Sequence, residues 1–107
     1  MKGLAQALSQ ASQYAIVSQE VSKNGEAIGF LYREAAAFEQ DSGWRFFSGW
    51  ESDEYVADVA HFDTLPLSEV VAMQPEIKTL LNEQYGAWEW SDDVQDFVPV
   101  QDWQPQA

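Results

Sequence analysis

Hydrophobic and polar residues alternate in two stretches in the first third of the chain, residues 14–21 and 27–34. This alternation, with many β-branched and aromatic residues, is typical of strands that have one buried face. Asn24-Gly25 lies between the two stretches. Asn-Gly favours the positive backbone φ angles of tight hairpin turns. The pattern therefore predicts an antiparallel β-hairpin.

Residues 44–48 predict a third strand in the same sheet. They are apolar on both faces apart from Arg45, as expected for a strand in the middle of a sheet. The preceding Asp41-Ser42-Gly43 has the composition of a turn. We therefore expect the chain to reverse direction just before this strand.

Short helices are predicted after the third strand, each marked by a residue type that favours helix starts. Leu65-Pro66 separates the first helix from the second. The predicted helices are residues 53–59 with Ser52 as the N-cap, residues 69–73 with Ser68 as the N-cap, and a third that begins at Pro75 and runs to about Leu81.

The last third of the chain predicts two more strands, residues 87–90 and 97–100, with Pro99 marking an edge strand. Strands and helices are segregated, which indicates an α+β fold. We expect a single domain with a mainly antiparallel sheet of about five strands and two or three short helices. Its parts are residues 1–13 as a short N-terminal helix or arm, residues 14–100 as the domain, and residues 101–107 as a polar tail with Trp103 as a possible anchor.

Charge narrows the choice of partner. The 107 residues include 18 acidic and 5 basic side chains, for a net charge of −13. Such a chain repels nucleic acid and anionic membranes but attracts basic proteins. No apolar stretch approaches the roughly 20 residues of a membrane span, and the N-terminus lacks the pattern of a signal peptide. The expected location is the cytoplasm.

Residues that carry catalysis, cofactors or metals are scarce. The chain has no cysteine and a single histidine, His61, so nucleophilic catalysis and ordinary zinc sites lack their residues. No glycine-rich phosphate loop and no calcium loop occurs. We expect neither an enzyme nor a cofactor or metal site. Arg33 and Arg45 are expected to pair with carboxylates such as Glu34 or Asp41, or to stack on aromatic rings.

The most distinctive segment is residues 41–55, Asp-Ser-Gly-Trp-Arg-Phe-Phe-Ser-Gly-Trp-Glu-Ser-Asp-Glu-Tyr, in which an aromatic strand ends at a glycine and carboxylates follow at once. Together with Ile-Gly-Phe-Leu-Tyr-Arg-Glu at residues 28–34, it resembles the hallmark of the immunity protein 33 family of bacterial polymorphic toxin systems. The resemblance extends over residues 14–100, and Trp50 stands where that family is expected to have a polar residue. It implies a non-catalytic protein that neutralises a toxin by binding it.

A partly exposed aromatic ringed by carboxylates is typical of a binding site for a basic protein. The segment can equally serve folding, in which case the interface lies in other loops. An acidic adaptor for a basic host protein, or a protein with no toxin link, is the alternative function. The predicted partner-binding residues are Trp50, Glu51, Asp53, Glu54, Tyr55 and Asp58, with Asp92 and Asp93 as a second patch.

Overall fold

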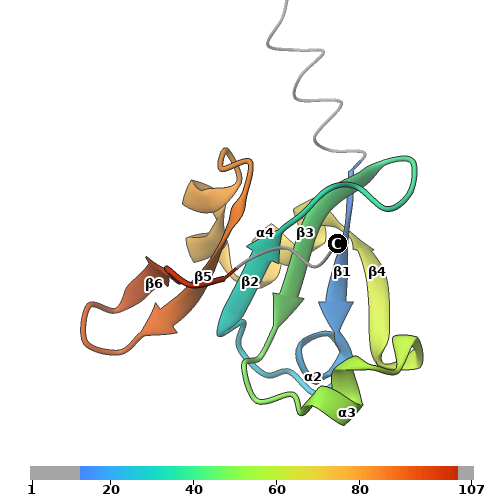
Figure 1. The fold of residues 1–107 in the computed structure, drawn as a ribbon, viewed down its shortest axis with the longest axis horizontal. Coiled ribbons are helices and arrows are strands. Elements are labelled where there is room, and N and C mark those ends of the chain that lie inside the picture. Colours follow the sequence, from blue (N-terminus) through green and yellow to red (C-terminus); the bar gives the residue numbers. More distant parts are fainter. Residues whose placement is uncertain (1–12, 104–107) are drawn as a thin grey trace, which may run out of the picture.

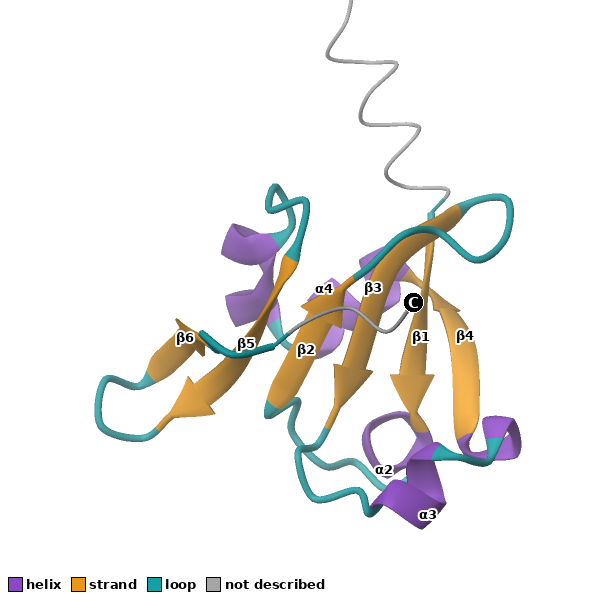
Figure 2. Cartoon of the chain, viewed as in Figure 1, coloured by secondary structure: helices purple, strands orange, loops and turns teal. Residues whose placement is uncertain are grey.

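One six-stranded sheet organises residues 13–103, the part of the chain that the computed structural model describes (Figures 1 and 2). The predicted N-terminal helix or arm lies outside the described residues except for residue 13. The elements in chain order are β1 (Tyr14–Ser18), α2 (Gln19–Ser22), β2 (Phe30–Arg33), β3 (Asp41–Phe47), α3 (Asp53–Val56), η1 (Val59–His61), β4 (Phe62–Pro66), α4 (Leu67–Met73), η2 (Pro75–Leu80), β5 (Gly86–Ser91) and β6 (Asp96–Pro99).

The strand order is β4-β1-β3-β2-β5-β6. Only β1 and β3 pair in parallel, and the other four pairings are antiparallel. The predicted α+β fold with a mainly antiparallel sheet is therefore confirmed. The sheet has one strand more than expected, because residues 62–66 form β4 at one edge. Strand β6 forms the other edge, as Pro99 predicted.

The predicted hairpin between residues 14–21 and 27–34 is wrong. Strands β1 and β2 do not pair with each other but lie on opposite sides of β3. The first stretch also ends early, because the Ser18 hydroxyl accepts a hydrogen bond from the Glu20 amide and starts α2. Alternation along a strand reports which face is buried but not which strand lies beside it. The Asn-Gly pair therefore turns the chain out of a helix rather than within a hairpin.

The predicted turn at Asp41-Ser42-Gly43 is also wrong, because these residues belong to β3. Opposite them, the pairing register advances by two residues on β1, from Tyr14 to Ile16, and by four on β3, from Asp41 to Arg45. The extra residues form a β-bulge, a feature that uses the same residue types as a turn. Gly43 has φ +87°, a conformation that favours glycine.

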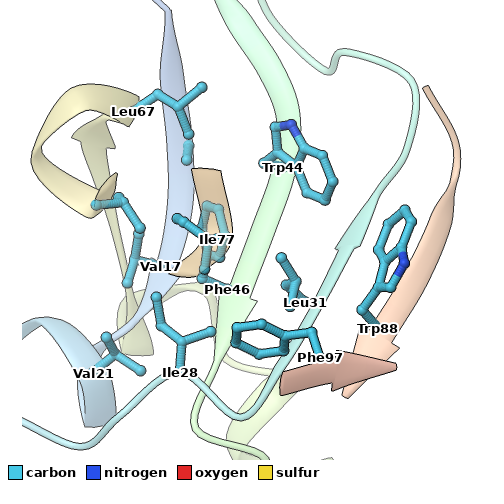
Figure 3. Close-up of a cluster of buried hydrophobic side chains, with 12 residues drawn as sticks. Val17, Val21, Ile28, Leu31, Trp44, Phe46, Leu67, Ile77, Trp88 and Phe97 are labelled. Atoms are coloured by element: carbon cyan, nitrogen blue, oxygen red, sulfur yellow. The ribbon is translucent and has the colours of Figure 1, made fainter. Parts of the chain in front are cut away.

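The hydrophobic core lies between one face of the sheet and the helices α4 and η2, which are behind the sheet in Figure 1. Figure 3 shows Trp44, Phe46 and Leu31 on neighbouring strands, with Trp88 beside them on β5. The Trp44 ring stacks on Phe46 and meets Trp88 with ring centres 5.6 Å apart. Ile77 of η2 is fully buried in the same cluster. These contacts fix β3 as the centre of the domain.

The helices match the predictions in part. Ser52 caps α3 as predicted, with its hydroxyl accepting from the Tyr55 amide at 3.1 Å, although α3 ends three residues earlier than expected. Pro75 opens η2 as predicted. Ser68 is not a cap, because α4 already begins at Leu67, directly after strand β4. Within residues 13–103, every helix is too short to cross a membrane.

Candidate functional site

Arg45 forms a buried ion network with Asp41 and Glu34. The Arg45 guanidinium donates to both oxygens of Asp41 at 2.8 Å, and its Nε donates to Glu34 at 2.7 Å. The Asp41 side chain is 0% exposed and that of Arg45 is 5% exposed. Burial alone would raise the pKa of Asp41, but hydrogen bonds from Arg45 and from the amides of Ala37 and Gly43 keep it below its ordinary value.

Arg33 is half-buried and is also held by contacts within the protein. Its guanidinium carbon lies 5.6 Å from the centre of the Trp44 ring, and its Nη1 donates to the Glu83 carbonyl at 2.8 Å. The predicted uses of Arg33 and Arg45, stacking and carboxylate pairing, are thereby confirmed. Both arginines stabilise the fold.

The segment from Ser48 to Glu51 forms a turn that the Glu51 carboxylate closes. Its two oxygens accept hydrogen bonds from the backbone amides of Ser48 at 2.8 Å and Gly49 at 2.9 Å. Burial would raise the pKa of Glu51, but hydrogen bonds from the Ser18 side chain and from the backbone amides of Ser48 and Glu51 hold it below its usual value. Glu51 therefore shapes the loop, and its oxygens are already occupied.

We expect Glu51→Gln to lower the free energy of unfolding by about 1–2 kcal/mol at pH 7, because an amide oxygen replaces one of two charged acceptors. Since the pKa of Glu51 is lowered in the folded state, its contribution is full above the ordinary value of 4.5 and is lost as the pH falls through the folded-state pKa. Urea unfolding of both proteins from pH 7 to pH 3 measures this. A difference between them that stays constant over that range would contradict the assignment.

The other predicted residues of the first patch lie in different surroundings. Trp50 is 87% exposed, whereas Tyr55 is half-buried and its ring stacks on His61 with centres 4.1 Å apart. His61 donates from Nδ1 to the Tyr55 carbonyl at 2.8 Å, so the histidine has a structural role. The Asp58 side chain caps η1. Asp53 and Glu54 are exposed in the first turn of α3.

An open groove of about 1380 Å³ brings parts of the two predicted patches together. It lies where β2 begins, where β3 and β5 end, and where α4 meets η2. Trp50, Glu51 and Asp92 line it. The other five predicted residues lie outside its lining, namely Asp53, Glu54, Tyr55, Asp58 and Asp93.

The strand register builds the floor of the groove. Phe30 on β2 is paired with Phe47 on β3 and with Glu89 on β5, so these three side chains lie side by side on one face of the sheet. Phe30 and Phe47 pack with ring centres 5.8 Å apart. The Gln74 amide fixes the adjoining wall, because it donates to the Ile28 carbonyl at 3.0 Å and accepts from the Ile28 amide at 2.9 Å.

The lining of the groove carries six carboxylates and neither lysine nor arginine. Three of the six are engaged: Glu34 pairs with Arg45, Glu51 closes its turn, and Asp92 accepts from the Trp90 indole at 3.0 Å. The other three, Glu26, Glu76 and Glu89, make no side-chain hydrogen bond or ion pair to any residue between 13 and 103.

Sequence reasoning missed those three glutamates, which come from a turn, a helix and a strand. Of the three, only Glu89 lies in a sequence context that could have suggested a binding role, since it stands between Trp88 and Trp90. Among the described residues, no group of three or more histidine, aspartate or glutamate side chains is placed to hold a metal ion. The groove therefore presents aromatic rings and unpaired negative charge to a ligand.

Comparison with known families places this geometry in context. The family model for the immunity protein Imm33 domain matches residues 15–101, which include the sheet apart from Tyr14 and the lining of the groove apart from Trp103. Comparisons with curated proteins and with solved structures gave no match.

Proposed function

Because the chain belongs to the Imm33 family of immunity protein domains, we propose that it neutralises a cognate toxin by binding to it, without catalysing a reaction. The observation that carries this proposal is the groove beside Trp50. This indole is 87% exposed at the rim of a concave surface that holds six carboxylates and no cation. An exposed tryptophan costs solubility, and a binding role accounts for it.

The composition of the groove suits a basic toxin. The net charge of −13 speeds the encounter with a positively charged surface and disfavours acidic partners. Burial of aromatic rings then slows dissociation, since tryptophan is among the residues that contribute most to interfaces. In the complex, Trp50 is the anchor and the glutamates around the groove select the partner.

We expect Trp50→Ala to weaken toxin binding by about 2 kcal/mol, or roughly thirtyfold, mainly through faster dissociation. Its free energy of unfolding should stay within about 0.5 kcal/mol of that of the wild type, because the ring has few contacts to lose. The measurements are survival of cells that express the toxin encoded beside this gene, and binding kinetics with the purified toxin.

Tyr85→Ala is the matched control, because Tyr85 is also an exposed aromatic, at 64%, and lies outside the groove. It should protect cells as well as the wild type does. A wild-type protein that neither binds the neighbouring toxin nor protects cells would refute toxin neutralisation and favour an adaptor for another basic protein. Full protection by Trp50→Ala would instead indicate that the interface lies outside the groove.

A further inference from the structure

We infer that the groove recognises an arginine side chain on an exposed basic segment of its protein partner. This inference rests on the proposed function, since it names the chemical group that the partner contributes. The groove offers two things that a guanidinium uses: exposed carboxylate oxygens and aromatic faces. Each is available for contact in the free protein.

The carboxylates are available because no residue in the described part of the chain pairs with them. Glu26, Glu76 and Glu89 line the groove from three separate elements, and their oxygens have no partner among residues 13–103. A guanidinium carries five N–H donors, enough to engage more than one of these groups.

The aromatic faces come from Trp50, Trp90 and Trp103, which line the same groove. Trp50 is almost fully exposed, and Trp90 and Trp103 are half-buried. The Trp103 ring is tilted against that of Tyr32 on the sheet, with ring centres 5.0 Å apart. The groove therefore offers indole rings as well as carboxylates to a cation.

The fold itself shows how these groups engage arginine. Arg33 lies over the Trp44 ring, and Arg45 forms paired hydrogen bonds with Asp41. The groove carries the same two kinds of partner with no arginine of the chain between them. Arginine is favoured over lysine because its planar guanidinium is more weakly hydrated and stacks on aromatic rings while it binds carboxylates.

The test uses two capped pentapeptides, Gly-Arg-Gly-Arg-Gly and Gly-Lys-Gly-Lys-Gly, titrated into the full ¹⁵N-labelled chain. We expect the indole N–H signals of Trp50 and Trp90 to move, while those of the buried Trp44 and Trp88, 1% and 7% exposed, stay in place. The arginine peptide should bind about two- to fivefold more tightly than the lysine peptide, the difference that stacking at an exposed site supplies.

Two triple variants separate the groove from the overall charge. Glu26→Gln/Glu76→Gln/Glu89→Gln should weaken binding of the arginine peptide about tenfold, as expected for three exposed charge contacts. Glu39→Gln/Glu69→Gln/Glu83→Gln removes the same charge from exposed sites outside the groove and should change the affinity less than twofold. Equal weakening by both variants, or equal binding of the two peptides without indole shifts, would overturn the inference.

These outcomes are independent of toxin neutralisation. If the protein protects cells but its groove does not bind the arginine peptide, the proposed function stands and this inference is wrong. If the groove binds the arginine peptide but the protein gives no protection, the arginine site stands and the proposed function is wrong.

Discussion

Arg45→Met is expected to lower the free energy of unfolding by about 3–5 kcal/mol, the usual cost of removing one partner from a buried ion pair. Arg45 donates to both oxygens of Asp41, whose side chain is fully shielded from water. Without the guanidinium, the Asp41 charge keeps only the amides of Ala37 and Gly43 as donors. Glu34 loses less, because its side chain is 26% exposed and can be hydrated.

The measurement is urea unfolding at pH 7, followed by the fluorescence of the buried tryptophans. Lys78→Met is the control, since Lys78 is an exposed cation outside the network, and it should cost less than about 0.5 kcal/mol. The double variant Asp41→Asn/Arg45→Met should recover part of the loss, because it no longer buries an unpaired charge. A loss below about 1 kcal/mol for Arg45→Met alone would contradict the role of the network.

Gly43→Ala is expected to cost at least about 3 kcal/mol. Two penalties combine: the positive φ of +87° disfavours any side chain by about 1–2 kcal/mol, and a Cβ atom at this position would overlap the Glu34 carbonyl. The strands cannot separate easily, because the Glu34 amide donates to the Gly43 carbonyl at 3.0 Å. The same unfolding assay measures the loss.

Gly25→Ala isolates the first penalty, the cost of the positive φ. Gly25 has a similar φ of +75°, but a Cβ atom there would meet no atom within 4 Å. It should therefore cost only the backbone term of about 1–2 kcal/mol. If the two variants were equally stable, the bulge at Gly43 would not be closely packed against Glu34.

The structure divides the distinctive segment into two parts with different roles. Asp41, Gly43 and Arg45 build the base of the sheet, and Glu51 closes the turn that follows. Trp50, which lies between them in sequence, contributes little to that framework and projects into solvent. A residue that departs from the rest of its segment in this way is a reasonable place for specificity toward one partner.

The sequence by itself determined the fold class, most of the strands and the use of the arginines. These follow from local chemistry: the run around Trp44, apolar on both faces apart from Arg45, favours a central strand, and Pro99 cannot donate within a sheet. Ser52 could be identified as a helix cap because capping depends on residues within one turn. In the same way, the absence of cysteine and the single histidine argued against nucleophilic catalysis and an ordinary zinc site.

Tertiary structure decided which strands lie side by side and where the groove is. Alternation gives β1 and β2 a buried face each, but only packing against β3 separates them, so the hairpin prediction failed. Asp41-Ser42-Gly43 has the same composition in a turn as in a bulge, and the β1 register selects the bulge. Glu26, Glu76 and Glu89 come from a loop, η2 and β5, and they line one groove only because the fold brings these segments together, which no local pattern encodes.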